Sequence, residues 1–457
     1  MAVIRLRDEI HARLRDHLLS RPGEHFAFLR ARTSVSLGEP LFLVYDVALV
    51  ADEHVRFDER GWEIDPDVLL AIVNDAIRNG DALIEAHNHG GPIPRPSRLD
   101  RDQYSEFVPY IHDSLAGRPY AATVWGDSTV YGEFFLADGT TGPVRSITSV
   151  GSRLEQVVSR DDDNRRAEYR YERQLAWFTR AGQLQLARLR VGLIGAGGTG
   201  SHMALQLPYL GTRDVVVADP DSIDETSGNR TVTATPADTD TPKAIAARRT
   251  IKSVAPSAAV EAFVADVREP RVLDALKRVD VLFGCVDNDG ARLVLNELAV
   301  AYNIPYFDLA VGIDATEGLI GQAGGRLAAV LPGGPCLLCM DEIDRVEARY
   351  FLSTPEQQAE QRRRGYVTGM DVPAPSVVSL NGAIASMALN EFAIYVSGSR
   401  PVSPLMELDL LGNGRSLAAQ WTVPRRVARN PGCVTCAQAG MGDASGLIRY
   451  ALSSAEA

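Results

Sequence analysis

Residues 189–211 read LRVGLIGAGGTGSHMALQLPYLG, and this stretch decides the fold of the second half of the chain. Its apolar start, residues 189–195, predicts a buried strand, and residues 201–211 predict a helix. Glycines between a strand and a helix allow a tight turn, and they let a phosphate approach the backbone N–H groups at the helix start. The stretch therefore predicts a nucleotide-binding turn. Its glycines are Gly195, Gly197, Gly198 and Gly200.

Strand-like and helical segments alternate through the rest of this half. Residues 214–219 (DVVVAD) and 279–288 (VDVLFGCVDN) predict further strands, and residues 290–302 predict a helix after them. A long apolar helix is expected at about 377–396, and it is too short and too polar for a membrane span. This alternation implies an α/β domain with a doubly wound, mostly parallel, Rossmann-like sheet over residues 168–457.

The first half mixes the two periodicities differently. Residues 1–148 alternate strand-like runs with helical ones, which predicts an α+β domain. Met1 to Ser20 is expected to form one amphipathic, charged helix with no apolar signal core. Residues 149–167 contain the polar run DDDNRR and little apolar periodicity, so we expect a linker there.

The composition describes a globular protein. The chain has 457 residues, 45% hydrophobic and 23% charged, which predicts two or three domains. A net charge of −12 and the lack of a long basic run argue against nucleic-acid binding. The five cysteines do not form a secreted disulfide pattern, and no window suits a membrane span. We expect a cytoplasmic protein.

Four of the five cysteines form two Cys-x-x-Cys pairs, Cys336 with Cys339 and Cys433 with Cys436. Two such pairs offer four thiolates at a spacing that suits a closed, tetrahedral zinc site. A tetrad leaves no open ligand position for catalysis, so we expect a structural zinc ion. Two disulfides or a redox pair are the alternatives.

A second metal pattern lies in the first half, where His87-x-His89 is followed by Ser97 and Asp100. Two histidines that alternate along a strand end point to the same face, and a nearby loop carboxylate can close a three-ligand zinc site. Such a site leaves one position open for water, whose pKa zinc lowers to about 7. Surface histidines beside a proline-rich loop are the alternative.

This spacing resembles the JAMM motif of the JAB/MPN metallopeptidases, which cut isopeptide or peptide bonds after ubiquitin-like tails. That family also has an upstream Pro-x-Glu-x-x-Gly-x-Leu pattern, which residues 22–29 (PGEHFAFL) match except at Ala27. The resemblance covers about residues 10–145. It implies that Glu24 is the general base and that Ser97 helps to stabilise the oxyanion. It also implies a catalytic zinc ion on His87, His89 and Asp100.

Charged residues suited to phosphate chemistry surround the glycine turn in the sequence. Basic groups can clamp a triphosphate, and a carboxylate at a strand end can hold magnesium. The glycines alone also fit an NAD-dependent oxidoreductase, with Asp219 at the spacing of a ribose contact. A nicotinamide site, however, does not need several dispersed basic residues. The candidates are Arg173, Asp219, Asp221, Asn229, Arg230, Lys243 and Asp287.

Together these residues resemble the ubiquitin-activating-enzyme superfamily, in particular its ThiF- and MoeB-type members, over about residues 168–440. Those enzymes adenylate the C-terminal glycine of ubiquitin-like or sulfur-carrier proteins. The resemblance implies a homodimer in which Arg173 reaches the ATP of the neighbouring subunit. Ser227 departs from the family, which usually has asparagine there. The implied ligands are Asp219 for the ribose, Arg230 and Lys243 for phosphate, and Asp287 for magnesium, with Asp221 and Asn229 beside them.

Family members that form a covalent thioester carry a cysteine after the first Cys-x-x-Cys pair, and residues 340–381 contain none. The fifth cysteine, Cys285, lies two residues before Asp287 and is expected to be structural. We therefore expect an acyl-adenylate that passes to a separate partner, either a conjugating-enzyme cysteine or a sulfur donor.

The expected function combines the two halves of the chain. The second half would use ATP to adenylate the C-terminal glycine of a ubiquitin-like protein that ends in diglycine. The first half would process or remove that protein, within a bacterial conjugation pathway. Activation of a sulfur carrier for cofactor biosynthesis is the first alternative. An NAD-dependent oxidoreductase or a degenerate carrier-binding scaffold is the second.

Overall fold

The computed structural model divides into two compact units, each described by itself. Unit 1 is Met1–Arg166 together with Gly440–Ser445, and unit 2 is Ala167–Ala439 together with Gly446–Ala457. The described residues are 1–36, 38–58, 61–89, 94–127, 129–158, 169–316, 319–364, 375–411, 420–422 and 427–449.

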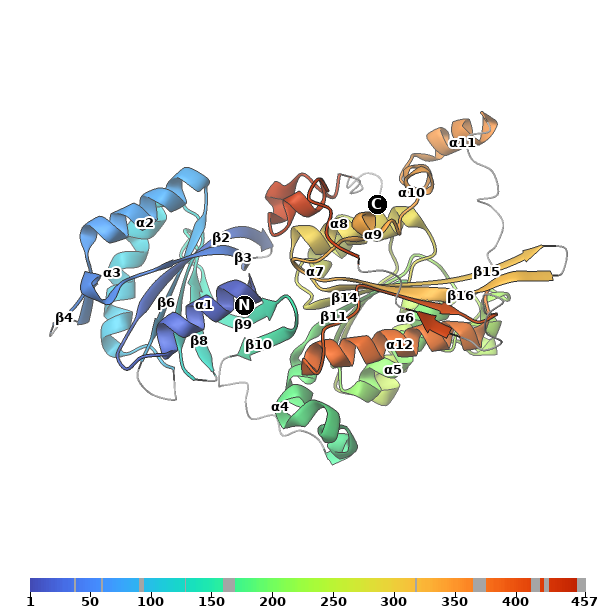
Figure 1. Ribbon diagram of the computed structural model, residues 1–457, viewed down its shortest axis with the longest axis horizontal. Coiled ribbons are helices and arrows are strands. Elements are labelled where there is room, and N and C mark those ends of the chain that lie inside the picture. Colours follow the sequence, from blue (N-terminus) through green and yellow to red (C-terminus); the bar gives the residue numbers. More distant parts are fainter. Residues whose placement is uncertain are drawn as a thin grey trace. The chain divides into compact units, whose positions relative to one another are not determined.

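Unit 1 mixes strands and helices along the chain, as Figure 1 shows. In chain order they are β1 (Ala2–Arg7), α1 (Asp8–Leu19), β2 (Phe26–Ser36), β3 (Glu39–Leu49), β4 (Val55–Asp58), β5 (Gly61–Ile64), α2 (Pro66–Asn79), β6 (Ala82–Asn88), α3 (Arg98–Ser114), β7 (Tyr120–Trp125), β8 (Val130–Phe135), β9 (Thr141–Val150) and β10 (Leu154–Val158).

The large sheet of unit 1 has helices on both faces. Its strand order is β1-β3-β2-β6-β7-β8-β9-β10, and β1 also pairs with β9, which closes the sheet on itself. Side chains alternate between the faces of a strand, so β6 supplies both cores. Ala82, Ile84 and Ala86 join the core of α1, whereas Leu83 joins that of α2 and α3. Strand β6 is therefore buried along its whole length.

The expectation of one helix over Met1–Ser20 was wrong for its first part. Residues 2–7 form β1, which lies between β3 and β9, and α1 begins at Asp8. Ala2, Ile4 and Leu6 are buried in the same core. These three apolar residues are two positions apart, which fits a strand. The helical pattern belongs to the charged residues that follow them.

Unit 2 carries the predicted strand–helix alternation. In chain order its elements are α4 (Leu175–Arg188), β11 (Arg190–Ile194), α5 (Gly198–Leu210), β12 (Asp214–Ala218), α6 (Lys243–Val254), β13 (Ala259–Phe263), α7 (Pro270–Leu276), β14 (Val281–Gly284), α8 (Asp289–Ala301), β15 (Tyr306–Thr316), β16 (Leu319–Val330), α9 (Leu337–Met340), α10 (Arg345–Phe351), α11 (Pro355–Arg363), α12 (Val378–Ser397), β17 (Leu405–Asp409) and β18 (Gln420–Thr422).

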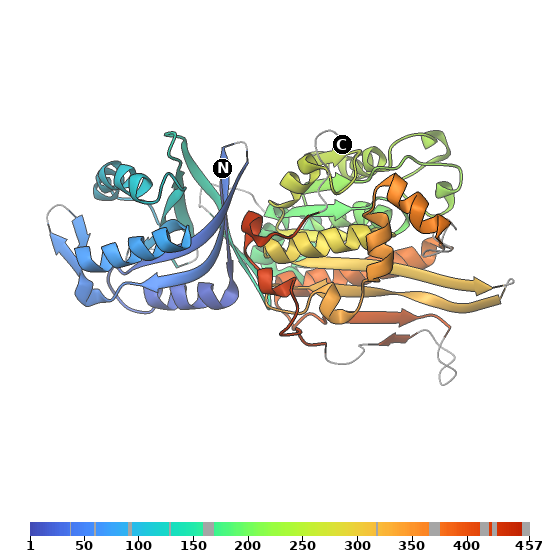
Figure 2. The same cartoon turned by 90° about the horizontal axis from the view of Figure 1, so that it is seen from above.

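The sheet of unit 2 has the order β13-β12-β11-β14-β15-β16-β17-β18. The strands from β13 to β15 in that order are parallel, and β16, β17 and β18 continue the sheet antiparallel. Helix α8 packs on β14, β15 and β16, and α12 covers β15 and β16 from the other side (Figures 1 and 2). From β11 the strand order runs to β12 and β13 on one side, and from β14 to β15 on the other. The topological switch point therefore lies between β11 and β14, and ligands of such sheets bind in the crevice at that point.

Two glycines let the chain pass closely at this switch point. Gly195 has a φ of +84°, and a β-carbon there would lie 2.4 Å from the carbonyl oxygen of Cys285, at the end of β14. A β-carbon on Gly200 would lie 1.9 Å from the carbonyl oxygen of Gly195. Neither position accepts a side chain without a backbone shift, so the shape of the turn depends on both glycines.

The stretch expected to be a linker, residues 149–167, starts inside the fold of unit 1. Strand β9 ends at Val150, and β10 follows it at residues 154–158. Residues 159–168 lie outside the described residues, so the polar run in this stretch is not part of the description. None of the helices in the described part of the chain is long and apolar enough to cross a membrane.

Replacing Gly200 with alanine should lower the free energy of unfolding of unit 2 by about 1–3 kcal/mol, because the new methyl group overlaps the carbonyl of Gly195. Gly312→Ala is the matched control, since a β-carbon there meets nothing within 4 Å. Thermal or urea unfolding of both variants measures the difference. Equal stability of the two variants would contradict the tight turn.

Candidate functional site

A cavity of about 1380 Å³ opens where β11, β12 and β14 end, at the crevice of the sheet. Ligand pockets are commonly about 300–1,000 Å³, so this cavity has room for more than a small molecule. Most of the residues expected to bind nucleotide lie in its wall. These are Gly195, Gly197, Gly198, Asp219, Asp221, Arg230, Lys243 and Asp287.

Asp219, at the end of β12, holds the glycine turn. Its carboxylate accepts hydrogen bonds from the backbone N–H of Ala196, at 2.6 Å, and of Asp221, at 2.8 Å. Burial raises the pKa of Asp219, although both hydrogen bonds and the charge of Lys243 oppose the shift. The side chain expected to contact a ribose therefore also fixes the turn that would face the phosphates.

The basic residues of the cavity are held by local partners. The Lys243 ammonium lies 2.8 Å from the carboxylate of Asp221. The backbone N–H of Lys243 also donates to the carbonyl of Asp221, so two bonds join these residues. The Arg230 guanidinium donates to the carbonyl of Thr226. Lysine and arginine are thus both placed at the wall of one cavity, where they can meet an anionic ligand.

Three expected residues are not in this wall. Gly200 lies behind the turn, where it makes room for the carbonyl of Gly195. Asn229 is exposed on a short 3-10 turn, and Arg173 is exposed on another, Tyr169–Gln174. Ser227, the departure from the family pattern, is buried, and its hydroxyl donates to the Asp224 carboxylate. It therefore stabilises the local turn.

No sequence motif marks Asn381, a buried residue of α12 that also lines the cavity. Its amide donates to the hydroxyl of Ser376, and its oxygen lies 3.4 Å from the hydroxyl of Thr199. A β-carbon on Gly198 would come within 2.4 Å of this amide. The start of α12 is thus tied to the start of α5. Only the fold brings them together, since about 180 residues separate them in the chain.

Cys285 is half-buried at the end of β14, in the same wall. Burial raises the pKa of its thiol far above the ordinary value, and the charge of Asp308 adds to the shift. A thiol in this state does not ionise near neutral pH and is a poor nucleophile.

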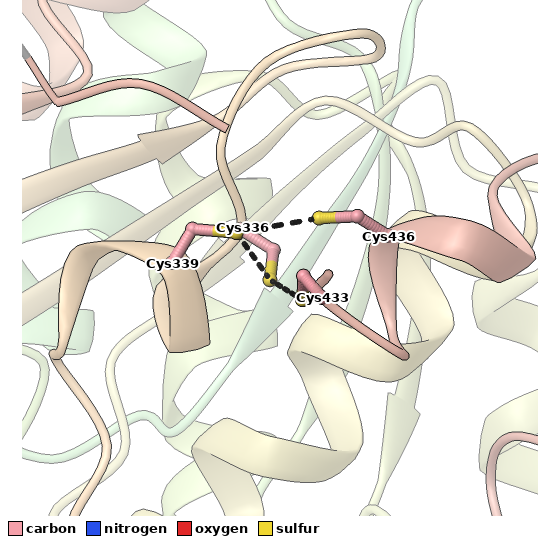
Figure 3. Close-up of side chains that lie close together, drawn as sticks. All are labelled: Cys336, Cys339, Cys433 and Cys436. Atoms are coloured by element: carbon pink, nitrogen blue, oxygen red, sulfur yellow. Dashed lines mark hydrogen bonds between the residues drawn. The ribbon is translucent and has the colours of Figure 1, made fainter. Parts of the chain in front are cut away.

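The four paired cysteines converge, and their sulfur atoms point toward one another (Figure 3). Cys336 Sγ lies 3.9 Å from Cys339 Sγ and 3.7 Å from Cys433 Sγ, and Cys339 Sγ lies 3.6 Å from Cys436 Sγ. Ligands bound to zinc at 2.3 Å in tetrahedral geometry are about 3.8 Å apart. A disulfide would need about 2.05 Å. The geometry fits a tetrathiolate metal site, and all four are free cysteines.

Neighbouring groups favour the thiolate form of Cys336, and the thiolate is the form that binds a cation. A hydrogen bond from Cys436 lowers the pKa of Cys336 to about 5, in spite of burial. The backbone N–H of Asn430 points at Cys339 Sγ, at 3.4 Å. The backbone N–H of Leu337 is held by the side chain of Asn296, which anchors the first pair to α8. Thiolates with N–H donors around them are typical metal ligands.

The three ligand candidates of unit 1 also come together. The Nε2 atoms of His87 and His89 are 3.2 Å apart, and the carboxylate of Asp100 lies 3.7 Å from the first and 3.3 Å from the second. Ligands at 2.0–2.1 Å from a tetrahedral zinc ion are about 3.3 Å apart. The spacing of the set therefore fits three ligands of one zinc ion.

Hydrogen bonds within this cluster shift the pKa values of His87 and Asp100 against the effect of burial. Burial would lower the pKa of His87, but hydrogen bonds to Asp100 and Glu85 outweigh it and raise it to about 9. Burial would raise the pKa of Asp100, but its bonds to His87 and His89 lower it well below the ordinary range. A metal ion must replace the proton on His87, so its binding would release protons.

Ser97 caps helix α3 beside this cluster. Its hydroxyl accepts from the backbone N–H of Asp100, and its own backbone N–H donates to the Asp100 carboxylate. The indole of Trp62 lies 3.3 Å from the other oxygen of that carboxylate. Asp100 is therefore oriented toward the histidines by the cap and by an aromatic residue that the sequence analysis did not single out.

Glu24, the expected general base, precedes β2. Glu24 lies two residues before Phe26, which pairs with His87 across β2 and β6. Asn88 fixes this segment: its side chain accepts from the N–H of His25 and donates to the carbonyl of Gly23. Both bonds flank Glu24, so Asn88 is a further positioning residue. Asn88 lies between the two histidines of the motif, but its hydrogen-bond partners, Gly23 and His25, lie far from it in the sequence.

Comparison with known proteins identifies the family of unit 2. The model of the ThiF family matches residues 171–434, which is more than half of the chain. The chain belongs to the ThiF family. The ThiF match lies within unit 2 and contains the glycine turn, the residues that line the cavity, and the cysteines Cys336, Cys339 and Cys433.

Three relatives of this ThiF protein show how far the similarity extends. It is 30% identical over 159 residues to the SAMP-activating enzyme E1 of Haloferax volcanii, covering 35% of this chain and 56% of the relative. It is 30% identical over 177 residues to the sulfur carrier protein ThiS adenylyltransferase of Bacillus subtilis, covering 37% and 50%. Protein HesA of Leptolyngbya boryana is 28% identical over 273 residues, covering 59% and 84%. The chain spans about half the length of the first two.

Among solved structures, Escherichia coli MccB with ATP is similar at 16% identity, with a TM-score of 0.44, covering 59% of this chain and 74% of that one.

Purified protein should contain two zinc ions per chain, because both clusters have the size of a zinc site. His87→Ala should remove one equivalent and Cys436→Ser the other, as measured by plasma emission of the dialysed proteins. His112→Ala, on α3 outside both clusters, is the control. An unchanged zinc content in His87→Ala would contradict a metal site in unit 1.

Proposed function

We propose that unit 2 uses ATP to adenylate the C-terminal carboxylate of a small carrier protein. The observation that carries this proposal is the shared wall of one cavity, which contains the glycine turn, the basic side chains of Arg230 and Lys243, and the strand-end carboxylate of Asp287. The ThiF family match supports it. A dinucleotide site would explain the glycines, but it would leave Arg230 and Lys243 without a role.

The residues suggest how the reaction would run. A carboxylate oxygen of the carrier attacks the α-phosphorus of ATP, the bond to the bridging oxygen breaks, and pyrophosphate leaves with the electron pair. The N–H groups at the start of α5, with Arg230 and Lys243, would stabilise the negative charge on the phosphates. Asp219 would hold the ribose, beside Asp221 and Asn229. Magnesium on Asp287 would neutralise part of the phosphate charge.

We favour a sulfur carrier as the substrate over the conjugation pathway expected from the sequence. Two relatives at about 30% identity are named ThiS adenylyltransferases, from Bacillus subtilis and Escherichia coli. The raised pKa of Cys285 makes it a poor nucleophile, and the other cysteines converge in the tetrad, so no described thiol is suited to a thioester. The acyl-adenylate would then pass to a separate sulfur donor. The cysteine of a partner conjugating enzyme is the second candidate acceptor of the acyl group. In a homodimer, Arg173 would reach the ATP of the neighbouring subunit.

A second candidate function concerns unit 1, where the geometry of His87, His89 and Asp100 supports a zinc-dependent peptidase of the JAB/MPN type. Zinc there would polarise a carbonyl and lower the pKa of a water molecule. Glu24 would accept the proton of that water and pass it to the leaving amine, and the Ser97 hydroxyl would donate to the oxyanion. The substrate would be the tail of the same carrier, either a precursor or a conjugate.

Lys243→Ala should lower ATP–pyrophosphate exchange with a diglycine-ended sulfur carrier about 10²–10³-fold, because phosphate charge loses a fixed cation. Lys252→Ala is the matched control, since this lysine is exposed on the same helix, away from the cavity. Exchange at the wild-type rate in Lys243→Ala would contradict the proposed site. NAD binding without ATP binding would restore the oxidoreductase.

Glu24→Gln should slow cleavage of a carrier precursor about 10²–10⁴-fold, because the amide cannot accept the proton. Zinc content should stay at the wild-type value, since Glu24 is not among the three ligand candidates. Glu106→Gln, an exposed glutamate of α3, is the control. Cleavage that persists in Glu24→Gln would remove this residue from the role of base.

A further inference from the structure

Glu85 is a fully buried carboxylate whose partners all belong to unit 1. It lies two residues before His87 on β6, so both side chains point to the face that carries α2 and α3. One oxygen of Glu85 lies 3.0 Å from Nδ1 of His87. The other accepts a hydrogen bond of 2.8 Å from the hydroxyl of Tyr120, on the neighbouring strand β7. Each oxygen thus has one partner.

This contact decides which nitrogen of His87 is available. A carboxylate at Nδ1 requires the proton of a neutral imidazole to be on that atom, so the lone pair is on Nε2. Nε2 is the atom that faces His89 and Asp100. The ring is therefore held in the tautomer and the orientation that a metal ligand needs, with Glu85 as the outer partner.

The charges of the pocket point to the same ligand. Glu85 and Asp100 are both buried, and no lysine or arginine in the described part of the chain pairs with either. With neutral histidines the group carries two negative charges. Histidines that bind a metal ion are neutral, and one divalent cation would then balance the charges of the two buried carboxylates.

We propose that Glu85, held by Tyr120, is a positioning residue that sets the affinity of the His87–His89–Asp100 group for a divalent metal ion. The proposal rests on the metal site of the second candidate function. It goes beyond it because the JAMM resemblance gave no role to this position, and the sequence shows only one glutamate in an apolar strand. Outer carboxylates of this kind change metal affinity about 10–100-fold.

The experiment compares three near-isosteric variants by zinc competition against a chromophoric chelator. Glu85→Gln keeps an acceptor for His87 and a donor for Tyr120 but removes the charge. Tyr120→Phe removes only the hydrogen bond to Glu85. Tyr104→Phe is the matched control, because Tyr104 is a buried tyrosine of α3 whose hydroxyl has no hydrogen-bond partner. The tetrad stays loaded, and the unfolding midpoint of each protein without the His87-dependent zinc ion is measured in parallel.

The dissociation constant for the zinc ion that His87→Ala abolishes should rise about 10–100-fold in Glu85→Gln, and about 10-fold in Tyr120→Phe. Tyr104→Phe should bind as the wild type does. Wild-type affinity in Glu85→Gln, with or without a lower unfolding midpoint, would reduce Glu85 to a packing role and overturn the proposal. Equal losses of zinc affinity in Tyr120→Phe and Tyr104→Phe would also overturn the proposal. If the wild type lacks His87-dependent zinc, the metal site itself fails, whereas adenylation by unit 2 is untouched.

Discussion

The backbone of the glycine turn lies against the end of β14, and the nucleotide site depends on this close approach. A β-carbon at Gly195 would come within 2.4 Å of the Cys285 carbonyl, and the N–H of Cys285 donates to the carbonyl of Ile194. Since β11 and β14 are neighbours at the switch point of the sheet, this contact brings Asp287 to the same cavity as the start of α5. Asp219 completes the arrangement from β12, because its carboxylate binds the N–H of Ala196. The cavity is thus shaped by backbone contacts, and the charged side chains are placed around it.

The two candidate metal clusters differ in their number of ligands, and this number limits what a bound zinc ion could do. The tetrad has four thiols at zinc spacing, so a zinc ion bound there would have no position open and would only stabilise the fold. The group in unit 1 has three ligand candidates and two buried carboxylates within reach of the histidines. Under the proposed peptidase function, a zinc ion on these three ligands would keep one position for a water molecule. The difference in ligand number is thus the basis for proposing a structural ion in unit 2 and a catalytic ion in unit 1.

Much of the site could be predicted because its residues follow recognisable local patterns. The glycine turn, the strand-end residues Asp219 and Asp287, and the spacing of the histidines and cysteines all follow from periodicity or motif. Asn381, Trp62 and Glu85 could not be found in this way, since each acts through a partner from another element. Residues 2–7 were misjudged because a helical pattern follows them directly, while the partners that make them a strand, β3 and β9, lie far along the chain. Asn229 matched a motif, but its exposed turn does not line the cavity.

We propose that the turn at residues 195–199 binds the phosphates of ATP. Hydrogen–deuterium exchange of the full chain, with and without ATP and magnesium, measures this binding at the backbone amides themselves. We expect slower exchange of the amides at 195–199 and at the start of α6 with ATP, and no change with NAD. Unchanged exchange at these amides under saturating ATP, or equal protection by NAD, would contradict it.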